Sequence, residues 1–421
     1  MLTAVLRKEH KNKWERRTAL TPDAVGTLSE KGYSVDVESS DIRIFEDGSY
    51  TEKNANLVNT PSQHQLVVGI KEPPVDSIEL NQVHIAFSHT IKGQPYNMPL
   101  LQRFIDQKAT LFDYETIVNE RGARTIAFGR FAGIAGAIDT FWIAGQKLSL
   151  INKQSDIQKI SQTKDYESIK SIKETFSELD LQKGEPVRVL VVGTGNVGRG
   201  AEEVCRWLKL PKIDIDSILL GHIPEGSWYA VASSRHINRR KDGGDFEFDD
   251  FVANGTLEYD SSFDELLGKF NVLVQTPYWT EKYPKHLTRE RMKANRQKLP
   301  WVVGDISCDI DGSLECTKIA STIDEPAFTY NAEDDSYKNG ISWDGPTVMS
   351  IDNLPCELSK DSSEHFSAIL KNYIPHLMNL ELDKEFDDLD LHPELYRSLI
   401  VYRGKLTPNY KYLKKYLSQQ S

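Results

Sequence analysis

A glycine-rich turn set between an apolar run and a helical segment constrains the fold of this chain more than any other stretch. Residues 187–192 read VRVLVV, a β-branched run typical of a strand buried on both faces of a parallel sheet. A turn with the spacing G-x-G-x-x-G follows, and residues 201–210 then have a helical pattern. This order predicts a dinucleotide-binding unit, because the glycine backbone and the helix N-terminus suit a diphosphate. The residues predicted to contact the dinucleotide are Gly193, Thr194, Gly195, Asn196, Val197 and Gly198.

The alternation of strand-like and helix-like segments predicts an α/β fold with more than one core. A chain of 421 residues is long enough for two or three domains. Strands are predicted at residues 34–37, 65–70, 84–88 and 110–112 before the turn, and at 213–220, 228–232, 271–275 and 301–306 after it. Helices are predicted at residues 22–31, 166–179, 357–382 and part of 393–417. Ser262 and Glu265 have the spacing of a capping box, and residues 332–339 are predicted to form a surface loop.

Composition argues against several kinds of protein. A net charge of −11 is unfavourable for a nucleic-acid surface, which needs clustered Lys and Arg. The longest apolar run, residues 125–145, contains Arg130 and Asp139, which are costly inside a bilayer, so we predict a buried helix and no membrane partner. The four cysteines form no C-x-x-C pair, which indicates a reducing compartment and no metal site. The N-terminus lacks an apolar signal core, so we expect a cytoplasmic protein, with an organelle as the alternative.

Polar residues follow three successive predicted strands of the first half of the chain. Lys71 and Glu72 follow the first of them, His89 and Lys92 follow the second, and Glu115 follows the third. Ligands of open α/β sheets gather at the carboxyl ends of strands, so Lys71 and His89 are candidates for acid/base chemistry. A partly buried lysine near other cations has a lowered pKa, and histidine titrates near neutrality. The plain alternatives are a solvated lysine and a histidine satisfied at a strand end.

Two arginines are candidates for binding a carboxylate substrate. The guanidinium groups of Arg17 and Arg124 can each donate two parallel hydrogen bonds to a carboxylate. An amino-acid or dicarboxylic substrate needs such groups. Taken alone, each arginine is more often a member of a surface ion pair than a substrate-binding group.

The cofactor's ribose has two candidate partners. An acid about 20 residues after the glycine turn selects NAD, and Asp214 or Asp216 stands near that spacing. If the second strand is instead residues 228–232, the strand ends in SSRHINRRK, which offers Ser233, Ser234, Arg235, Arg239 and Arg240 to a 2′-phosphate. This composition favours NADP(H), with NAD(H) as the alternative. If the segment binds no cofactor, it is a solvated basic loop.

Motifs spread over more than 350 residues resemble one family of enzymes. The sequence is similar to lysine-ketoglutarate reductase, the N-terminal half of the bifunctional aminoadipic semialdehyde synthase, to the lysine-forming saccharopine dehydrogenase and, more distantly, to alanine dehydrogenase. The matching stretches are ERRTALTP (residues 15–22), VGIKEPP (68–74), FSHTIKGQPYNMPLL (87–101), LFDYE (111–115), RGARTIAFGRFAGIAG (121–136), GTGNVGRGA (193–201), SSRH (233–236), GDIS (304–307) and SIDNLPCELSKDSSEHF (350–366).

The resemblance implies two Rossmann-like domains, each a parallel sheet flanked by helices, with a substrate cleft between them. The substrate-side domain is expected at residues 1–142 plus 353–421, and the dinucleotide-binding domain at 143–352. The resemblance also implies the roles of individual residues. Lys71 and His89 are the expected acid/base pair, Arg17, Arg124 and Lys92 are expected on the substrate side, Glu72 and Glu115 are expected to tune Lys71, and Asp352 is expected near the nicotinamide.

The resemblance implies reductive condensation of L-lysine with 2-oxoglutarate to saccharopine, using NADPH. One alternative is the same chemistry run with NAD toward lysine, and another is a nucleotide-binding relative without catalysis. The expected partners are small molecules and a separate glutamate-forming saccharopine dehydrogenase, because the bifunctional protein carries that second domain. Residues 150–184 match no motif, and we assign them no role.

Overall fold

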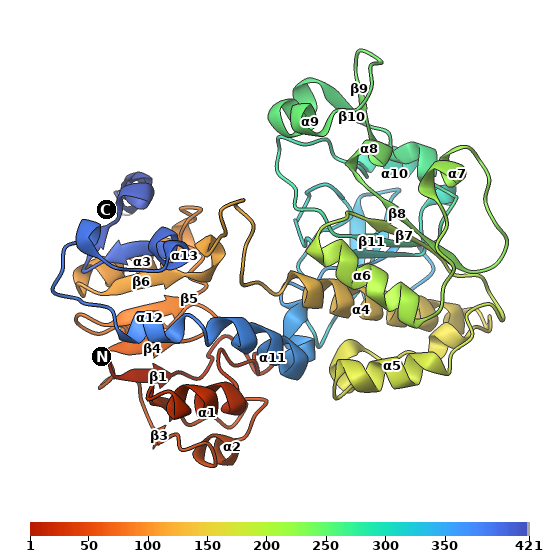
Figure 1. Cartoon of the computed structure of the whole chain (residues 1–421). Coiled ribbons are helices and arrows are strands. Elements are labelled where there is room, and N and C mark those ends of the chain that lie inside the picture. The colour runs from red at the N-terminus through yellow and green to blue at the C-terminus, as the bar shows by residue number, and fades with distance from the viewer. Residues whose placement is uncertain (419–421) are drawn as a thin grey trace. The chain divides into compact units, whose positions relative to one another are not determined.

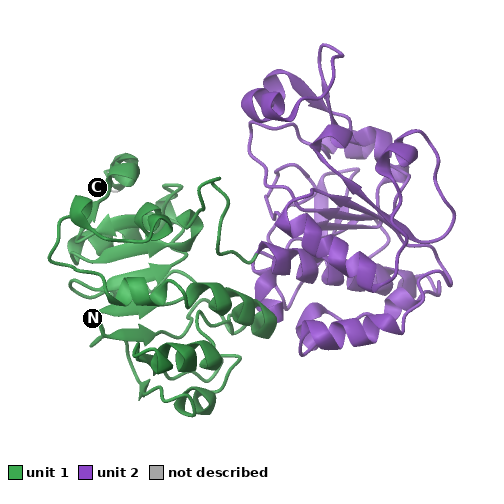
Figure 2. Cartoon of the chain, viewed as in Figure 1, with its two compact units in different colours: residues 1–128, 359–421 green, residues 129–358 purple. Residues whose placement is uncertain are grey.

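The structure is a computed structural model that describes residues 1–418 of the chain, shown in Figure 1. It divides into two compact units, which Figure 2 distinguishes by colour. Unit 1 comprises Met1–Phe128 and the chain from Ser359 onward, and unit 2 comprises Gly129–Leu358. The predicted boundaries at 142/143 and 352/353 differ from these, because the whole of helix α4 (Gly129–Leu150) packs within unit 2.

Unit 1 is built on an eight-stranded sheet with the order β17-β16-β6-β5-β4-β1-β2-β3. The six strands from the N-terminal part of the chain are parallel, and the two C-terminal strands extend the sheet in antiparallel fashion beside β6. The strands are β1 (Ala4–Leu6), β2 (Val35–Glu38), β3 (Leu57–Val58), β4 (Leu66–Val68), β5 (Val83–Ala86), β6 (Thr110–Asp113), β16 (Leu399–Tyr402) and β17 (Lys405–Leu406).

Helices cover both faces of this sheet, because its central strands are apolar on both sides. One buried cluster joins alternate residues of β1, β2, β4 and β5 to α1, α11 and α12, and another joins β6 and β16 to α3. The helices of unit 1 are α1 (Pro22–Glu30), α2 (Asp47–Thr51), α3 (Met98–Asp106), α11 (Ser359–Leu370), α12 (Ile374–Met378), α13 (Pro393–Ser398) and α14 (Lys414–Leu417).

Unit 2 is built on a seven-stranded sheet with the order β14-β13-β15-β12-β11-β7-β8. The five strands from β15 to β8 are parallel, and β13 and β14 continue the sheet as an antiparallel edge. The strands are β7 (Arg188–Val192), β8 (Trp228–Ala232), β11 (Val272–Gln275), β12 (Val302–Asp305), β13 (Phe328–Asn331), β14 (Ser336–Asn339) and β15 (Thr347–Met349), and a separate antiparallel pair is formed by β9 (Asn238–Arg240) and β10 (Tyr259–Ser261).

Helices α4 and α6 pack closely on each other beside this sheet. A side chain at Gly133 would overlap the carbonyl oxygen of Val197, and one at Gly200 would overlap that of Arg130, so glycine is required at both positions. Besides α4, the helices of unit 2 are α5 (Ile169–Ser177), α6 (Asn196–Trp207), α7 (Ile215–Leu219), α8 (Ser234–Ile237), α9 (Phe248–Asn254) and α10 (Arg289–Ala294).

The α/β architecture and most predicted elements are confirmed, and four local predictions are wrong. The predicted strand at residues 213–220 contains helix α7 (Ile215–Leu219) instead, since Ile215 and Ile218 bury one helical face. The predicted loop at 332–339 contains the exposed edge strand β14. The predicted helix at 357–382 breaks before Pro375, which stands in the first turn of α12. Ser262 precedes a 3-10 turn but its side chain makes no capping hydrogen bond.

The small-residue run at 125–145 lies largely within α4, and most of that helix is buried. In the part of the chain that the structure describes, residues 1–418, no helix is both long and apolar enough to cross a bilayer.

Candidate active site

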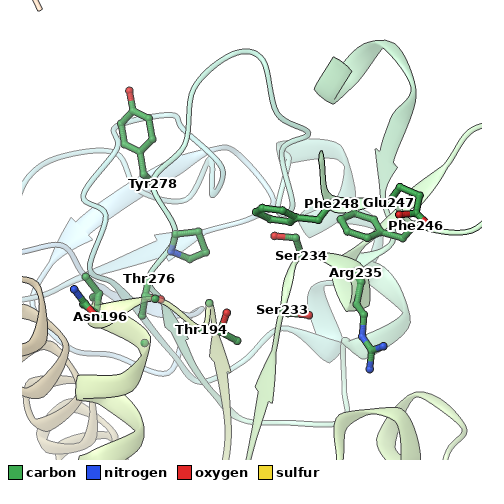
Figure 3. Close-up of a pocket in the computed structure, with 15 residues that line it drawn as sticks. Thr194, Asn196, Ser233, Ser234, Arg235, Phe246, Glu247, Phe248, Thr276 and Tyr278 are labelled. Atoms are coloured by element: carbon green, nitrogen blue, oxygen red, sulfur yellow. The ribbon is translucent and has the colours of Figure 1, made fainter. Parts of the chain in front are cut away.

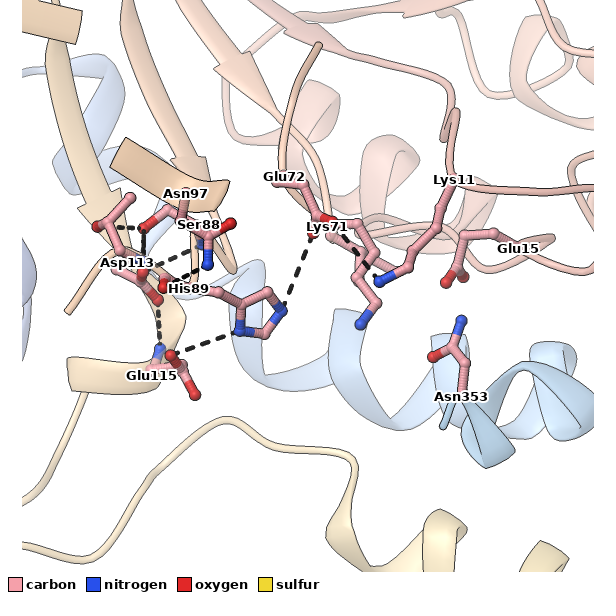
Figure 4. A network of polar contacts seen from close by, with 12 residues as sticks. Lys11, Glu15, Lys71, Glu72, Ser88, His89, Asn97, Asp113, Glu115 and Asn353 are labelled. Atoms are coloured by element: carbon pink, nitrogen blue, oxygen red, sulfur yellow. Dashed lines mark hydrogen bonds and ion pairs between the residues drawn. The ribbon is translucent and has the colours of Figure 1, made fainter. Parts of the chain in front are cut away.

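Three candidate residues lie at one edge of the unit 1 sheet. Strands β4, β5 and β6 are adjacent and parallel, with Val68 beside Ile85 and Ile85 beside Phe112. The segments after these strands therefore begin at the same level. They carry Lys71, His89 and Glu115, the first two of which Figure 4 shows approaching the same region of the edge. Parallel pairing thus brings together side chains that are up to 44 positions apart in the sequence.

His89 is held between two carboxylates. Its Nδ1 lies 3.5 Å from Oε2 of Glu115, and its Nε2 lies 3.9 Å from Oε2 of Glu72. The backbone of His89 has a φ of +54°, an uncommon conformation for a residue with a side chain, and Asn97 donates a hydrogen bond of 2.8 Å to its carbonyl oxygen. Strained backbone of this kind clusters at functional sites. One third of the side chain remains exposed, so a ligand can reach the imidazole.

Lys71 lies in surroundings that favour its neutral form. Burial lowers the pKa of Lys71 from its ordinary value, and the positive charges of Arg17 and Lys11 lower it further, while Glu15 and Glu72 oppose the shift. A lysine with a lowered pKa holds more of the neutral amine at physiological pH, which is the form that accepts a proton. The direction of this shift is the one that a general base needs.

Glu72 and Glu115 have different neighbours. Glu72 lies 3.5 Å from Nζ of Lys11 and is among the charges that act on Lys71. Glu115 instead contacts His89 and lies 3.2 Å from the guanidinium of Arg124. Burial opposes ionisation of Glu115, but the hydrogen bond and charge of His89, with the charges of Arg124 and Lys92, outweigh it and lower the pKa of Glu115. Glu115 thus contacts His89 rather than Lys71, the residue that both glutamates were expected to tune.

A buried polar pair supports the segment that carries His89. The carboxyl group of Asp113 accepts hydrogen bonds from the backbone N–H of Ser88, at 3.1 Å, and from the hydroxyl of Ser88. Burial and the charge of Glu115 raise the pKa of Asp113 to about 6. Because Ser88 directly precedes His89, the pair fixes the position at which the imidazole begins.

The two candidate arginines differ in accessibility. Arg17 is buried and donates hydrogen bonds of 2.7 and 2.6 Å to the two carboxylate oxygens of Glu15, with its guanidinium 4.4 Å from the ring centroid of Phe128. Arg124 is half-exposed beside Glu115. Lys92 is also exposed. An anionic substrate can therefore reach Arg124 and Lys92 from solvent, whereas Arg17 acts on Lys71 through its charge.

Two residues of this region were not identified from the sequence. Glu9 accepts hydrogen bonds from the backbone N–H groups of Ile70, at 2.7 Å, and Lys71, at 3.0 Å. Arg7 lies 3.3 Å from Glu9 and donates a hydrogen bond to the carbonyl oxygen of Lys71. Both charged side chains are buried, which is rare for such residues unless they are paired. The signal available in the sequence was the position of two opposite charges directly after the apolar run of β1.

Unit 2 contains a cavity of about 640 Å³ at the carboxyl edge of its own sheet, shown in Figure 3. Val192 pairs with both Ala232 and Gln275, so the segments after β7, β8 and β11 begin at one level. The cavity is lined by Gly193, Thr194, Gly195, Asn196, Val197, Gly198, Ser233, Ser234, Arg235, Phe246, Glu247, Phe248, Thr276, Pro277 and Tyr278. The six residues of the predicted glycine turn and both Ser234 and Arg235 are thus brought together.

The glycine turn has the geometry that a diphosphate requires. Gly193 has a φ of +102°, and a side chain at Gly198 would overlap the carbonyl oxygen of Gly193, so the turn is tight and α6 packs directly against it. A side chain at Gly195 would instead project into open space at the N-cap of α6. The first N–H groups of that helix therefore face the cavity without a capping side chain, and a helix N-terminus attracts anions.

The strand that follows the glycine turn in the chain and pairs with β7 is β8. β8 pairs directly with β7, so Ser233, Ser234 and Arg235 stand where a dinucleotide's ribose is expected. Asp216, on α7, lies 3.2 Å from Arg235, so the acid and the base considered for ribose recognition face each other. Arg239 and Arg240 are paired with Glu265 and with Asp242 and Asp250, outside the cavity lining.

The residues present fit a dinucleotide, with one predicted contact outside the cavity. The lining combines a glycine backbone, an uncapped helix N-terminus and a basic strand end, which suit diphosphate and ribose. Asp352 follows β15, is exposed, and acts on the nearby Cys308 rather than lining the cavity. Its predicted place near the nicotinamide stays a prediction. Phe246, Glu247, Phe248 and the segment Thr276 to Tyr278 line the cavity and were not identified from the sequence.

Comparison with known proteins matches this chain to one group of dehydrogenases and synthases. Residues 5–135 match the family model described as alanine dehydrogenase/PNT, N-terminal domain. The alpha-aminoadipic semialdehyde synthase of Arabidopsis thaliana is 31% identical over 434 positions, which cover 96% of this chain and 40% of the synthase. The mitochondrial synthase of Bos taurus is 28% identical, with 97% and 47% covered. The chain therefore spans less than half the length of these relatives.

A relative of similar length is found among fungal enzymes. The saccharopine dehydrogenase [NAD(+), L-lysine-forming] of Neurospora crassa is 30% identical over 386 positions, which cover 89% of this chain and 90% of that enzyme. Among solved structures, an L-alanine dehydrogenase has a TM-score of 0.64 at 17% identity, with 99% of this chain and 100% of that chain covered. The structural likeness supports the two-domain Rossmann-like fold.

Proposed function

Because the chain belongs to the saccharopine dehydrogenase family, we propose that it catalyses the NADPH-dependent reductive condensation of L-lysine with 2-oxoglutarate to saccharopine. The observation that carries the proposal is the placement of Lys71 and His89 after adjacent parallel strands, with burial and two cations lowering the pKa of Lys71. Neighbouring acid/base groups of this kind suit a reaction that moves several protons at one carbon–nitrogen bond.

The first half of the proposed reaction joins the two substrates. Neutral Lys71 accepts a proton from the ε-ammonium of the substrate lysine, and the freed amine adds to the keto carbon of 2-oxoglutarate. His89 moves the proton from nitrogen to oxygen, and then protonates the hydroxyl group, which leaves as water and gives an iminium. The carboxylates of Glu72 and Glu115 lie 3.9 and 3.5 Å from the two ring nitrogens, so the imidazole has a carboxylate beside each of its proton-carrying atoms.

The second half of the reaction reduces the iminium. A reduced nicotinamide, when bound, would supply the hydride for the iminium carbon. Protonated Lys71 would return its proton to the nitrogen of saccharopine. His89 regains a proton from solvent, so one NADPH and one proton are consumed per saccharopine formed. Arg124 and Lys92 would attract the carboxylates of the substrates, and positioning of this kind supplies a large part of the rate gain. Arg17, which is buried against Glu15, would contribute through its charge on Lys71.

The residues assigned to the cofactor lie in unit 2. The N-terminus of α6 would hold the diphosphate, and Ser234 and Arg235 would hold the ribose with its 2′-phosphate. Arg235 at the end of β8 supports NADP(H) over NAD(H). The acidic neighbours Asp216 and Glu247 keep NAD(H) as the second candidate, and they favour the NAD-dependent, lysine-forming reaction printed in the name of the Neurospora relative.

The test is an absorbance assay of NADPH and NADH oxidation with lysine and 2-oxoglutarate, run against a panel of other amino acids and 2-oxo acids. We expect oxidation that requires both substrates and is faster with NADPH. Lys71→Met and His89→Gln should each abolish turnover while NADPH still binds. Matched controls are Lys53→Met and His376→Gln, exposed residues of the same unit, which should retain full rates. Unchanged rates in the first two variants would point to a nucleotide-binding relative without this chemistry.

A further inference from the structure

The cavity of unit 2 has an aromatic side that the phosphate and ribose contacts leave unexplained. Phe246, Glu247 and Phe248 line it in the region of Ser234 and Arg235, as Figure 3 shows. They belong to an excursion of the chain between β9 and β10, two strands that pair with each other outside the main sheet. Phe248 is 60% exposed, so a large apolar ring faces the cavity rather than a protein core.

The excursion is built to hold these rings in place. Phe246 packs against Phe251 and Tyr259, with ring centroids 5.3 and 5.4 Å apart, and Tyr259 is fully buried. The hydroxyl of Tyr259 accepts the backbone N–H of Glu247 at 3.3 Å and donates to the carboxylate of Asp250 at 2.8 Å. The segment that carries Phe248 is therefore fixed by its neighbours before any ligand binds, which lowers the entropy lost on binding.

We propose that Phe248, with Phe246 behind it, forms the stacking surface for the adenine ring of the dinucleotide. The proposal rests on the cofactor assignment above, and it names the part of the cofactor that the excursion recognises. A diphosphate at the N-terminus of α6 and a ribose at the end of β8 leave the adenine to extend beyond β8. The next residues of the cavity in that direction are Phe246 to Phe248.

The chemistry of the surface fits a nucleobase. Adenine has a flat π face, and an aromatic side chain stacks on such a face without needing a particular hydrogen-bond pattern. Tyr278, the other exposed ring of the lining, follows β11 on a different side of the cavity and points away from Phe248 in Figure 3. Phe248 therefore serves the adenine end, and the nicotinamide end lies elsewhere.

The experiment compares the two halves of the cofactor by isothermal titration calorimetry on the full chain. The adenine half is represented by AMP and 2′,5′-ADP, the nicotinamide half by NMNH, and the intact cofactors by NADPH and NADH. Phe248→Ala should weaken AMP, 2′,5′-ADP and both intact cofactors by roughly tenfold, the value expected for one base–aromatic stack. Binding of NMNH should stay within experimental error.

Two variants test the physical reason. Phe248→Trp keeps an aromatic face and should retain adenine binding, whereas Phe248→Leu keeps an apolar side chain without that face and should behave like Phe248→Ala. The matched control is Leu257→Ala, because Leu257 lies in the same excursion, is 77% exposed and is outside the cavity lining. That variant should bind every ligand as the unchanged protein does.

The failures can be told apart. If the unchanged protein binds neither NADPH nor NADH, the proposed function falls and the adenine assignment falls with it. If the protein binds the cofactors tightly but Phe248→Ala leaves AMP and 2′,5′-ADP binding unchanged, only the adenine assignment is overturned. An equal loss for NMNH would overturn it too, because it would place Phe248 at the nicotinamide end.

Discussion

Glu9 accepts a hydrogen bond of 3.0 Å from the backbone N–H of Lys71, so a buried carboxylate at the end of β1 fixes the residue that follows β4. The same carboxylate binds the N–H of Ile70, and Arg7 holds the carbonyl oxygen of Lys71. A side chain at Gly69 would overlap the guanidinium of Arg7, so the absence of one there is needed for this contact. The backbone of Lys71 is thus held on both its donor and its acceptor side.

Replacing Glu9 with Gln should therefore lower kcat more than it affects cofactor binding. Gln has one acceptor oxygen, so it can accept a hydrogen bond from one of the two backbone N–H groups, and its NH2 group then faces the other N–H group. It also lacks the charge that pairs with Arg7. A displacement of about 1 Å at a catalytic group can cost roughly a hundredfold in rate. We expect a 10- to 100-fold loss in kcat, with the Kd for NADPH unchanged because the cofactor residues lie in unit 2.

The control for that variant is Glu38→Gln. Glu38 is as buried as Glu9 and also accepts a backbone N–H, that of Lys8 at 2.9 Å, but it ends β2 and does not contact Lys71. It should lose stability without a comparable loss in kcat. Equal kinetic losses in the two variants would mean that Glu9 only supports the fold.

The pH dependence of the reaction should respond to Lys11. The charge of Lys11 helps to lower the pKa of Lys71, so Lys11→Met should raise that pKa toward its ordinary value. Because neutral Lys71 is the proposed base, the acidic limb of the kcat/KM profile should move to higher pH. The measurement is a pH series of initial rates. Lys53→Met is the control, since Lys53 is an exposed lysine of the same unit that pairs with Asp23, and a profile that moves equally in both variants would contradict the prediction.

Cofactor choice should depend on Arg235. Removing a charged donor from a 2′-phosphate typically costs about 1.5–3 kcal/mol, or roughly a factor of 10 to 100. Arg235→Ala should reduce the ratio of kcat/KM for NADPH to that for NADH by this factor, with the NADH value little changed. Arg239→Ala is the matched control, because Arg239 is also exposed but pairs with Glu265 outside the lining. A ratio that Arg235→Ala leaves unaltered would remove the basis for preferring NADPH.

The close packing of α4 on α6 should make unit 2 sensitive to a single methyl group. Gly200→Ala places a carbon against the carbonyl oxygen of Arg130, and backbone cannot move aside as a flexible side chain can. Overpacking of this kind destabilises by about 1–3 kcal/mol, and more where backbone is displaced. Thermal unfolding should show a lowered Tm. Gly48→Ala, in helix α2 with open space around it, should leave the Tm unchanged or raise it.

Stability between about pH 4 and 6 should fall as pH rises because of Asp305. Burial raises the pKa of Asp305 to about 6, although Thr317 and Ser307 donate hydrogen bonds of 2.6 and 2.7 Å to its carboxyl group. In this range the folded protein holds a proton that the unfolded chain releases, so folding is favoured at the acidic end. The group contributes a loss of about 1–3 kcal/mol across the interval.

Asp305→Asn removes that titration. Urea unfolding of the variant should therefore show a weaker dependence on pH than the unchanged protein over the same interval, and the two should converge at the acidic end. Parallel curves for both proteins would show that Asp305 does not carry the effect.

Local pattern was enough to predict the elements that depend on neighbours in sequence. The apolar run, the glycine spacing and the helix after them fix β7, the turn and α6, since each depends on dihedral preferences and periodicity within a few residues. The same is true of α1, where Thr21 accepts a hydrogen bond from Ala24 and proline stands in the first turn. Prediction failed at residues 213–220, where IDIDSILL fits both periods and burial of Ile215 and Ile218 selects the helix.

The sequence by itself determined the type of fold, the glycine turn, and Lys71 and His89 as candidates, because these follow from local propensity, recurrent spacing and resemblance to known proteins. Only the tertiary structure decided which groups face one another: Glu9 beneath Lys71, Glu115 beside His89, Glu15 against Arg17, and Phe248 in the cavity of the glycine turn. The reason is physical. Burial and electrostatic interaction depend on distances through space, and parallel strand pairing sets those distances between residues that are far apart in the chain.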